Sequence, residues 1–241
     1  MRDAPFPHPE SLPLSHCPVV VVGAGPAGVT VGAVLRAAGV DCLVLETESR
    51  AFIEQRPRAG VIEEWAVRGL EQRGLAGNLS KRAERHTECE FRFDGRGHRF
   101  ACTELTGHHH WVYPQPLHNY VVEPMVFGRL FLAGDAAHLV APIATKGLNL
   151  ALHDAFLLGD ALVARLTRGD ATGLEGCSDA CLRRVWDYQE FSEWLSGIYH
   201  GTSWGDPYRA GTTLARLRRL FTSPVAAAAF AEQYLGTADA F

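Results

Sequence analysis

A glycine-rich turn near the N-terminus constrains the fold of this chain more than any other feature. The β-branched run Val19–Val22 leads directly into Gly23-Ala24-Gly25-Pro26-Ala27-Gly28. Such a run is typical of a strand buried on both faces of a parallel sheet. A helical pattern at residues 27–38 and a second apolar run at residues 41–45 complete a strand–helix–strand unit. The sequence therefore predicts an α/β fold with a Rossmann-like domain.

The glycines of this turn have the spacing of a dinucleotide-binding motif. Gly23 permits the tight turn, Gly25 lets the backbone approach a diphosphate, and Gly28 with Ala27 allows close contact between helix and strand. Glu46 follows the second strand near the ~20-residue spacing at which a carboxylate meets the ribose hydroxyls. The turn predicts dinucleotide binding, but by itself it does not separate FAD from NAD(P).

A second motif favours FAD. Residues 130–133 form an apolar run that ends at Gly134 and Asp135, where a glycine permits close approach and a carboxylate can accept hydrogen bonds from a polyol. A long helix is expected at residues 145–166, with Gly147 in its first turn. The N-terminus of a helix stabilises negative charge, as a reduced flavin requires. The alternative is an ordinary loop between a strand and a helix.

Composition excludes several classes of function. The formal net charge of -4 gives no basic field that would attract nucleic acid or anionic lipid. No apolar run is expected to reach the ~20 residues of a membrane-spanning helix. Residues 1–17 are expected to form a disordered, proline-rich leader rather than a secretory signal. The six cysteines contain no CxxC pair, which predicts reduced thiols in a cytoplasmic protein.

The remaining segments predict a hairpin and a helical C-terminal part. The alternating residues 90–93, the turn Asp94-Gly95 and residues 98–102 predict a β-hairpin. Helices are expected at residues 61–69, 178–199, 209–220 and 225–234. Four aromatic residues are expected in the core: Trp186, Phe191, Trp194 and Tyr199. The run at residues 108–110 is three histidines without an acidic or cysteine partner, so a solvated loop is favoured over a metal site.

Several motifs in a shared order resemble those of the 4-hydroxybenzoate 3-monooxygenases, a family of group A FAD-dependent aromatic hydroxylases. The likeness covers about residues 18–115 and 117–236, nearly the whole chain. The motifs that carry it are GAGPAG from Gly23, RPRAGV from Arg56, GRLFLAGDAAH from Gly128, KGLNLA from Lys146, CLRRVW from Cys181, EFS from Glu190 and AEQYLG from Ala231.

The resemblance implies an enzyme in which NADPH or NADH reduces FAD and the reduced flavin uses oxygen to hydroxylate a small phenolic acid such as 4-hydroxybenzoate. It further implies roles for four residues toward the cofactors. Glu46 would hold the adenosine ribose, and Asp135 would bind the ribityl chain. Arg58 would contact the diphosphate region and help receive NADPH, and Gln115 would contact FAD.

The same resemblance implies roles around the reacting ring. Leu148 and Asn149 would supply groups to the isoalloxazine. Pro142 would contact the substrate beside the flavin. Tyr234 and His86 would belong to the network that carries the phenolic proton of the substrate to solvent.

This chain departs from the family in its middle. About 150 residues, a domain's worth, are missing between the positions of Gln115 and Pro116, and with them most of the substrate-binding sheet. We therefore expect one FAD-binding domain over residues 18–241, with residues 87–115 as a vestigial hairpin of the substrate domain and residues 178–241 as C-terminal helices. A homodimer formed through those helices could cover exposed apolar faces.

Three functions remain open on the sequence. The first is the phenolic acid monooxygenase that the resemblance implies. The second is a shortened FAD-binding protein without hydroxylase activity, at most an NAD(P)H oxidase that releases hydrogen peroxide. The third is a nicotinamide-dependent dehydrogenase that uses the glycine turn alone, which leaves Asp135 unexplained.

Overall fold

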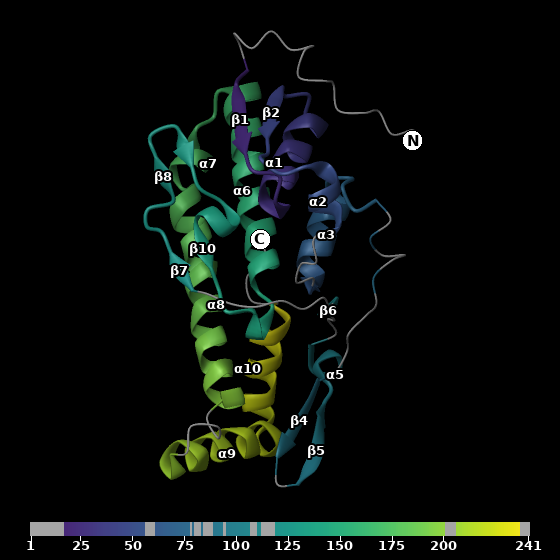
Figure 1. Ribbon diagram of the computed structural model, residues 1–241, viewed down its shortest axis with the longest axis vertical. Helices are drawn as coiled ribbons and strands as arrows, with labels where there is room; N and C mark the ends of the chain where they lie inside the picture. The colour runs from purple at the N-terminus through teal and green to yellow at the C-terminus, as the bar shows by residue number, and fades with distance from the viewer. Residues whose placement is uncertain are drawn as a thin grey trace.

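The computed structural model describes residues 17–55, 61–77, 79, 83, 89–93, 95–106, 110–111, 119–200 and 206–236. The proposed leader falls almost wholly outside these residues, as do two of the three consecutive histidines. Figure 1 shows an elongated molecule in which α6 runs through the N-terminal part and α8 extends from there to the C-terminal helices.

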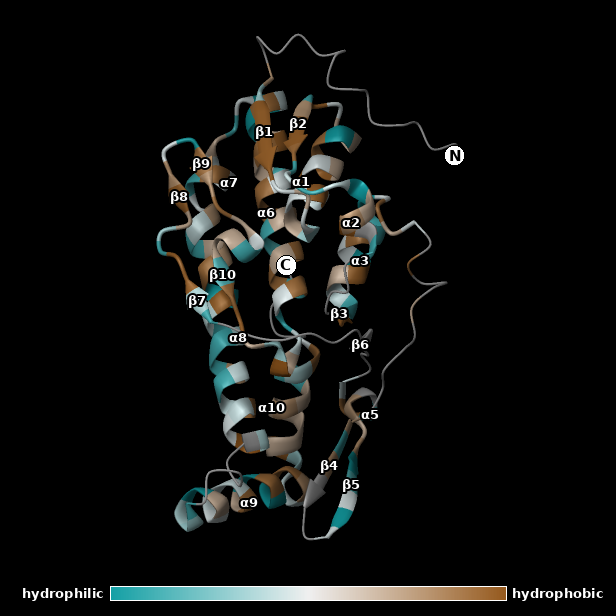
Figure 2. Ribbon diagram, in the orientation of Figure 1, coloured by the Kyte–Doolittle hydropathy of each residue, from teal (hydrophilic) through white to brown (hydrophobic). Residues whose placement is uncertain are grey.

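The predicted strand–helix–strand unit is present. Strand β1 (Val19–Val22) pairs in parallel with β2 (Cys42–Leu45), and helix α1 (Pro26–Ala37) connects them. Both strands are almost entirely hydrophobic (Figure 2). However, the expectation that β1 is buried on both faces is wrong, because Val20 is 51% exposed and Val22 is 83% exposed. Within the described residues this sheet consists of β1 and β2, and the face of β1 that carries Val20 and Val22 is not covered.

Helix α6 (Gly147–Arg168) confirms the predicted long helix and packs along α1. A Cβ added at Gly159 would lie 2.9 Å from a methyl carbon of Val34, so the two helices approach closely at this glycine. The sequence expectation of no candidate membrane span needs correction. Among the described residues, α6 is long and apolar enough to cross a membrane, but 67% of its apolar window is buried, as in a core helix.

The segment after the second strand differs from the prediction. Helix α2 (Arg50–Gln55) was not expected. The helix predicted at residues 61–69 begins instead as strand β3 (Ile62–Glu63), which pairs with β6 (His110–Trp111). Helix α3 (Glu64–Gln72) then continues past Gly69, where α3 lies against Phe156 of α6.

The segment before α6 consists of short strands and 3-10 turns. The strand expected at residues 130–133 is shorter, because β9 (Leu130–Phe131) forms only a two-residue antiparallel pair with β8 (Val126–Phe127). A 3-10 turn η3 (Gly134–Ala136) follows, and then β10 (His138–Leu139) pairs with β7 (Tyr120–Val121). A second 3-10 turn, η4 (Pro142–Ala144), precedes α6.

The C-terminal part is helical, as predicted. After the short α7 (Thr172–Glu175), α8 (Cys177–His200) leads into α9 (Pro207–Thr222) and α10 (Pro224–Leu235). The starts of α9 and α10 have the chemistry of helix N-termini. Asp206 and Ser223 accept hydrogen bonds from the first-turn backbone, and a proline follows each of them.

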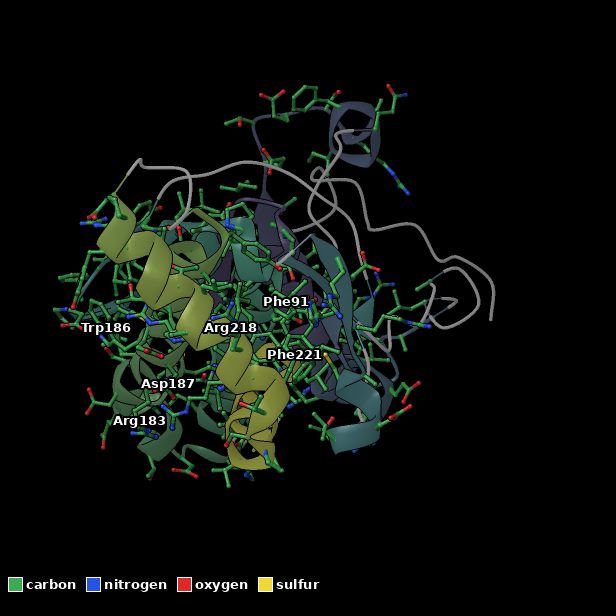
Figure 3. All side chains as sticks on the ribbon, turned by 90° about the horizontal axis from the view of Figure 1, so that it is seen from below. Phe91, Arg183, Trp186, Asp187, Arg218 and Phe221 are labelled. Carbon is green, nitrogen blue, oxygen red and sulfur yellow. The ribbon has the colours of Figure 1, made fainter. Side chains whose placement is uncertain are left out.

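The predicted hairpin is also confirmed. Strand β4 (Cys89–Phe93) pairs with β5 (Arg96–Phe100) in register, and the short α5 (Cys102–Thr106) follows. In Figure 3 the labelled Phe91 of the hairpin lies beside Phe221 of α9, and their ring centroids are 6.1 Å apart. The hairpin thus packs on the C-terminal helices.

The four aromatic residues expected in the core divide into two groups. Phe191 is 1% exposed and Trp194 packs partly buried against the same cluster as Phe91. Trp186 is 51% exposed, so its assignment to the core is wrong, and Tyr199 is 46% exposed although it stacks on Phe91. In Figure 3 Trp186 lies at the outer side of α8, near the labelled Arg183 and Asp187.

The packing of α1 on α6 predicts contrasting effects for two valines of one helix. Val31 is 4% exposed and Val29 is 49% exposed. Val31→Ala removes two buried methyl groups and is expected to lower the free energy of unfolding by about 2 kcal/mol. Val29→Ala has the same effect on helix propensity, but it should change the free energy of unfolding by less than ~0.5 kcal/mol. Urea denaturation measures both, and equal losses would contradict the packing described here.

Candidate cofactor-binding site

The glycine turn connects β1 to α1 and is closed by main-chain contacts. Gly23 has a φ of +100°, which favours glycine, and its N–H donates to the Leu45 carbonyl at 2.7 Å. A Cβ added at Gly28 would lie 2.0 Å from the Gly23 carbonyl oxygen. The turn therefore closes only because residue 28 has no side chain.

The N-terminus of α1 is open to an anion. Gly25 is the N-cap residue, and no side chain caps the helix there. A Cβ added at Gly25 would meet nothing within 4 Å. The first N–H groups of a helix lack intrahelical partners and carry partial positive charge, so a diphosphate fits this position.

Glu46 is held beside the glycine turn. One carboxylate oxygen accepts a hydrogen bond from the Ala24 N–H at 2.6 Å, and the other accepts from the Thr47 and Glu48 N–H groups at 2.8 and 3.0 Å. These bonds, with that from Ala24 the strongest, lower the pKa of Glu46 to about 2. The carboxylate is exposed and ionised at neutral pH, as an acceptor for ribose hydroxyls must be.

The second motif meets the first at Gly134. A Cβ added there would lie 3.0 Å from the Cβ of Ala27 and 3.2 Å from that of Ala151, and Gly134 has a φ of +59°. Its N–H donates at 2.8 Å to Asp154, a buried residue of α6 whose same oxygen lies 2.7 Å from Nε2 of His138. Asp154 therefore fixes the Gly134 turn to α6, directly against the start of α1.

Asp135 lies exposed in the same turn, next to Gly134. The Tyr120 hydroxyl donates to the backbone carbonyl of Asp135. Burial and then the charge of Asp135 raise the pKa of Tyr120, so this phenol stays protonated as a donor. The backbone of the turn is thus tied to β7.

The start of α6 presents a third group of predicted residues. Thr145 has a φ of +54°, the sole positive value at a non-glycine position in the described part of the chain. This left-handed residue lets the backbone turn from η4 into the helix. No side chain caps α6, so the N–H groups of its first residues, Gly147 and Leu148 among them, have no partner within the helix. Pro142 begins η4 and is partly exposed.

The side chain of Asn149 makes its hydrogen bonds within the protein. Its amide oxygen accepts from the Glu63 N–H at 2.7 Å, and its amide nitrogen donates to the carbonyls of Val61 and Thr145 at 2.8 and 3.3 Å. The side chain is fully buried. It positions β3 against α6, so the backbone of Asn149 is the part that a ring at the helix N-terminus could contact.

A buried ion pair lies behind the start of α6. Lys146 and Glu63 are both 0% exposed, and the ammonium of Lys146 donates to one oxygen of the Glu63 carboxylate. Lys146 also donates to the Tyr234 carbonyl at 2.8 Å. The other Glu63 oxygen accepts from Trp65 Nε1 and from the Tyr188 hydroxyl. Burial lowers the pKa of Lys146 and raises that of Tyr188, while the Glu63 charge opposes the first shift and adds to the second.

Glu63 was not predicted from the sequence as a site residue. Glu63 lies where the two-residue strand β3 passes directly into α3. So short a strand shows no alternation of apolar and polar residues that would mark Glu63 as buried. Lys146 was noted only as part of a motif. A charged residue that directly precedes a long apolar helix was the available sign of a buried partner elsewhere in the chain.

Tyr234 belongs to the aromatic cluster of the C-terminal helices. Its ring stacks on Phe230 at a centroid distance of 5.4 Å, and burial raises the pKa of its hydroxyl. Ile143 of η4 packs on the same cluster, and Lys146 binds the Tyr234 carbonyl. The structure thus brings Tyr234 and the Pro142 turn to the same end of α6. Arg58, Gln115 and His86 lie outside the described residues.

The fold and the turn together define a dinucleotide-binding α/β protein. Comparison with known proteins is more specific. The family described as "FAD binding domain" matches residues 16–119 and 98–192. The chain therefore belongs to this FAD-binding family, and FAD is its cofactor. The parts that fit FAD are the uncapped start of α1, the ionised Glu46 and the Gly134 turn that abuts α1.

Two curated relatives show the extent of the similarity. The chain is 40% identical over 121 residues to p-hydroxybenzoate hydroxylase of Acinetobacter baylyi, which is 50% of this chain and 30% of that protein. It is 50% identical over 46 residues to rifampicin monooxygenase of Rhodococcus hoagii, which is 19% of this chain and 10% of that protein. The matches thus span less than a third of these relatives.

Solved structures share the fold. p-Nitrophenol 4-monooxygenase PnpA of Pseudomonas putida superposes with a TM-score of 0.68 at 16% identity, covering 90% of this chain and 97% of that one. HpxO of Klebsiella pneumoniae, solved with FAD and uric acid, gives a TM-score of 0.67 at 14% identity, covering 90% and 96%. These similarities confirm the α/β FAD-binding fold.

The second and third glycines of the turn predict separable effects. Gly25→Ser places a hydroxyl at the N-cap, where it bonds the same N–H groups that a diphosphate needs. FAD affinity should fall by about tenfold or more while the stability holds. Gly28→Ser places its Cβ against the Gly23 carbonyl and should cost at least about 1–3 kcal/mol of stability. Flavin fluorescence titration and urea denaturation measure the two effects, and a Gly25→Ser variant with wild-type affinity would contradict the assignment.

The buried ion pair predicts non-additive mutations. Lys146→Met leaves the Glu63 carboxylate buried without its cation and should lower the free energy of unfolding by about 3–5 kcal/mol. Adding Glu63→Gln removes that charge, so the double variant should be more stable than Lys146→Met alone. Urea denaturation of the single and double variants gives the coupling. If the second substitution only destabilises further, the two side chains do not act as a pair.

Proposed function

We propose that the chain is an FAD-dependent monooxygenase that uses NAD(P)H and oxygen to hydroxylate a small phenolic acid. The observation that carries the proposal is the contact between the Gly134 turn and Ala27. It supports one cofactor whose diphosphate lies at the start of α1 and whose ribityl chain lies at the Gly134 turn. FAD, when bound, would supply hydride acceptance from a nicotinamide and reaction of the reduced ring with oxygen.

The residues of the chain have distinct parts in this proposal. The start of α1 would neutralise the diphosphate, and Glu46 would accept hydrogen bonds from the adenosine ribose. The uncapped N-terminus of α6 would stabilise negative charge on the ring system. Pro142 would lie beside the substrate, and Tyr234 would hold a proton at its hydroxyl, since burial keeps that hydroxyl protonated.

Two of the relatives support a phenolic substrate. One curated relative is named for p-hydroxybenzoate and one structural neighbour for p-nitrophenol, and both names denote small phenols. The described residues include a two-stranded hairpin, β4 and β5, where the resemblance leads us to expect a substrate domain. That hairpin packs through Phe91 on Phe221 of α9 and Phe230 of α10.

The shortened middle of the chain supports a second candidate, an NAD(P)H oxidase that releases hydrogen peroxide. Relative to the family it resembles, the chain lacks most of the sheet that would cover the flavin ring. Water that reaches the ring of a bound flavin diverts the electrons of reduced flavin to peroxide. The two candidates share the cofactor site and differ in what covers it.

Product analysis tests both. The purified chain is loaded with FAD and supplied with NADPH, oxygen and 4-hydroxybenzoate. Monooxygenation predicts a dihydroxybenzoate formed in proportion to the NADPH consumed. Peroxide formed in that proportion, with no aromatic product, supports the oxidase and contradicts the first proposal. Absence of any NADPH or NADH oxidation by the flavin-loaded protein contradicts both.

A further inference from the structure

Two cysteines face each other at the base of the hairpin. Cys89 begins β4 and is paired across the hairpin with Phe100, the last residue of β5. Cys102 follows two residues later, at the start of α5. The two Sγ atoms lie 3.9 Å apart, within hydrogen-bond distance for thiols. Nothing in the proposed flavin chemistry uses either of them.

The surroundings give the two thiols different access. Cys102 is 1% exposed and belongs to the aromatic cluster, whereas Cys89 packs at its edge and is only partly buried. The hydrogen bond from Cys89 lowers the pKa of the Cys102 thiol, which increases its thiolate fraction. A thiolate is the form of cysteine that attacks oxidised sulfur.

We propose that Cys89 and Cys102 form an oxidisable dithiol, which closes to a disulfide when hydrogen peroxide reaches Cys89. In the first step the Cys89 sulfur takes one peroxide oxygen, the O–O bond breaks, and one water leaves. In the second step the Cys102 sulfur attacks the oxidised sulfur of Cys89, the S–S bond forms, and the oxygen leaves as a second water. Two thiol protons and two electrons thus pass to the peroxide.

Helical geometry disfavours closure at the other neighbouring pair of cysteines. A disulfide requires Cβ atoms ~3.5–4.5 Å apart. Cys89 and Cys102 lie on different elements at the open end of a hairpin, and their sulfurs need to approach by about 2 Å to bond. Cys177 and Cys181 lie four residues apart on α8, where helical geometry holds Cβ atoms ~5–6 Å apart. That pair is therefore an internal control.

A disulfide between Cys89 and Cys102 would affect the part of the site that contains Tyr234. The bond would join the start of β4 to α5, and α5 packs against α10, which carries Tyr234. After burial, ionised sulfur at Cys89 or Cys102 is the next cause that raises the pKa of Tyr234. A disulfide cannot ionise, so oxidation would remove this contribution.

Peptide mapping tests the proposal on the full chain. Arg92, Arg96 and Arg99 lie between the two cysteines, so trypsin separates Cys89 from Cys102. The reduced protein is treated with one equivalent of hydrogen peroxide, blocked with an alkylating reagent and digested. We expect the accessible thiols under denaturing conditions to fall from six to four, with one linked peptide pair that holds Cys89 and Cys102.

Cysteine-to-serine variants test which thiols form the link. Cys89→Ser and Cys102→Ser should each abolish the linked pair, and Cys177→Ser should leave it unchanged. Cys89 is partly exposed, so its variant should fold, and circular dichroism checks this. Linkage mainly between Cys177 and Cys181, or stable over-oxidation of Cys89 without linkage, would overturn the proposal. Because the peroxide is added as a reagent, the result does not depend on the proposed function.

Discussion

The close approach of α1 to α6 is the constraint on which the cofactor site depends. Residues without bulky side chains lie where the two segments meet: Gly159 of α6 lies against Val34, and Gly134 lies against Ala27. A larger side chain at Gly134 would also require a left-handed backbone that favours glycine. The buried Asp154 carboxylate then holds the Gly134 N–H. The packing of α1 on α6 therefore sets the distance between the helix start proposed for the diphosphate and the turn proposed for the ribityl chain.

The N-terminal end of α6 is held in place by a buried ion pair rather than by close packing at small residues. Lys146 and Glu63 are buried together, and their remaining hydrogen bonds reach Trp65, Tyr188 and the Tyr234 carbonyl. A buried pair of this kind is costly to form, but once formed it penalises every arrangement in which one partner is missing. It ties β3, the start of α6, α8 and α10 together. The residues that the resemblance places beside the flavin ring are thus attached to a fixed polar centre.

The sequence predicted the positions of the helices and of the glycine turn better than it predicted burial and tertiary contacts. The glycine turn, Glu46 and the helices had strong local patterns, and α1, α6, α8, α9 and α10 lie close to the expected positions. Burial on both faces of β1 was wrong, because no described segment packs over the face that carries Val20 and Val22. The Glu63–Lys146 pair was missed, since the partners lie far apart in the chain. Such pairings depend on tertiary packing, which no local pattern encodes.

The central claim is that two motifs distant in the sequence, brought together by the packing of α1 on α6, hold one cofactor. Comparing the affinities of the chain for FAD, ADP and FMN by calorimetry tests it most directly. If both motifs act together, FAD should bind far more tightly than either fragment, because the second contact is made within one already bound molecule. An affinity for ADP equal to that for FAD would show that the glycine turn acts alone, and would contradict the account.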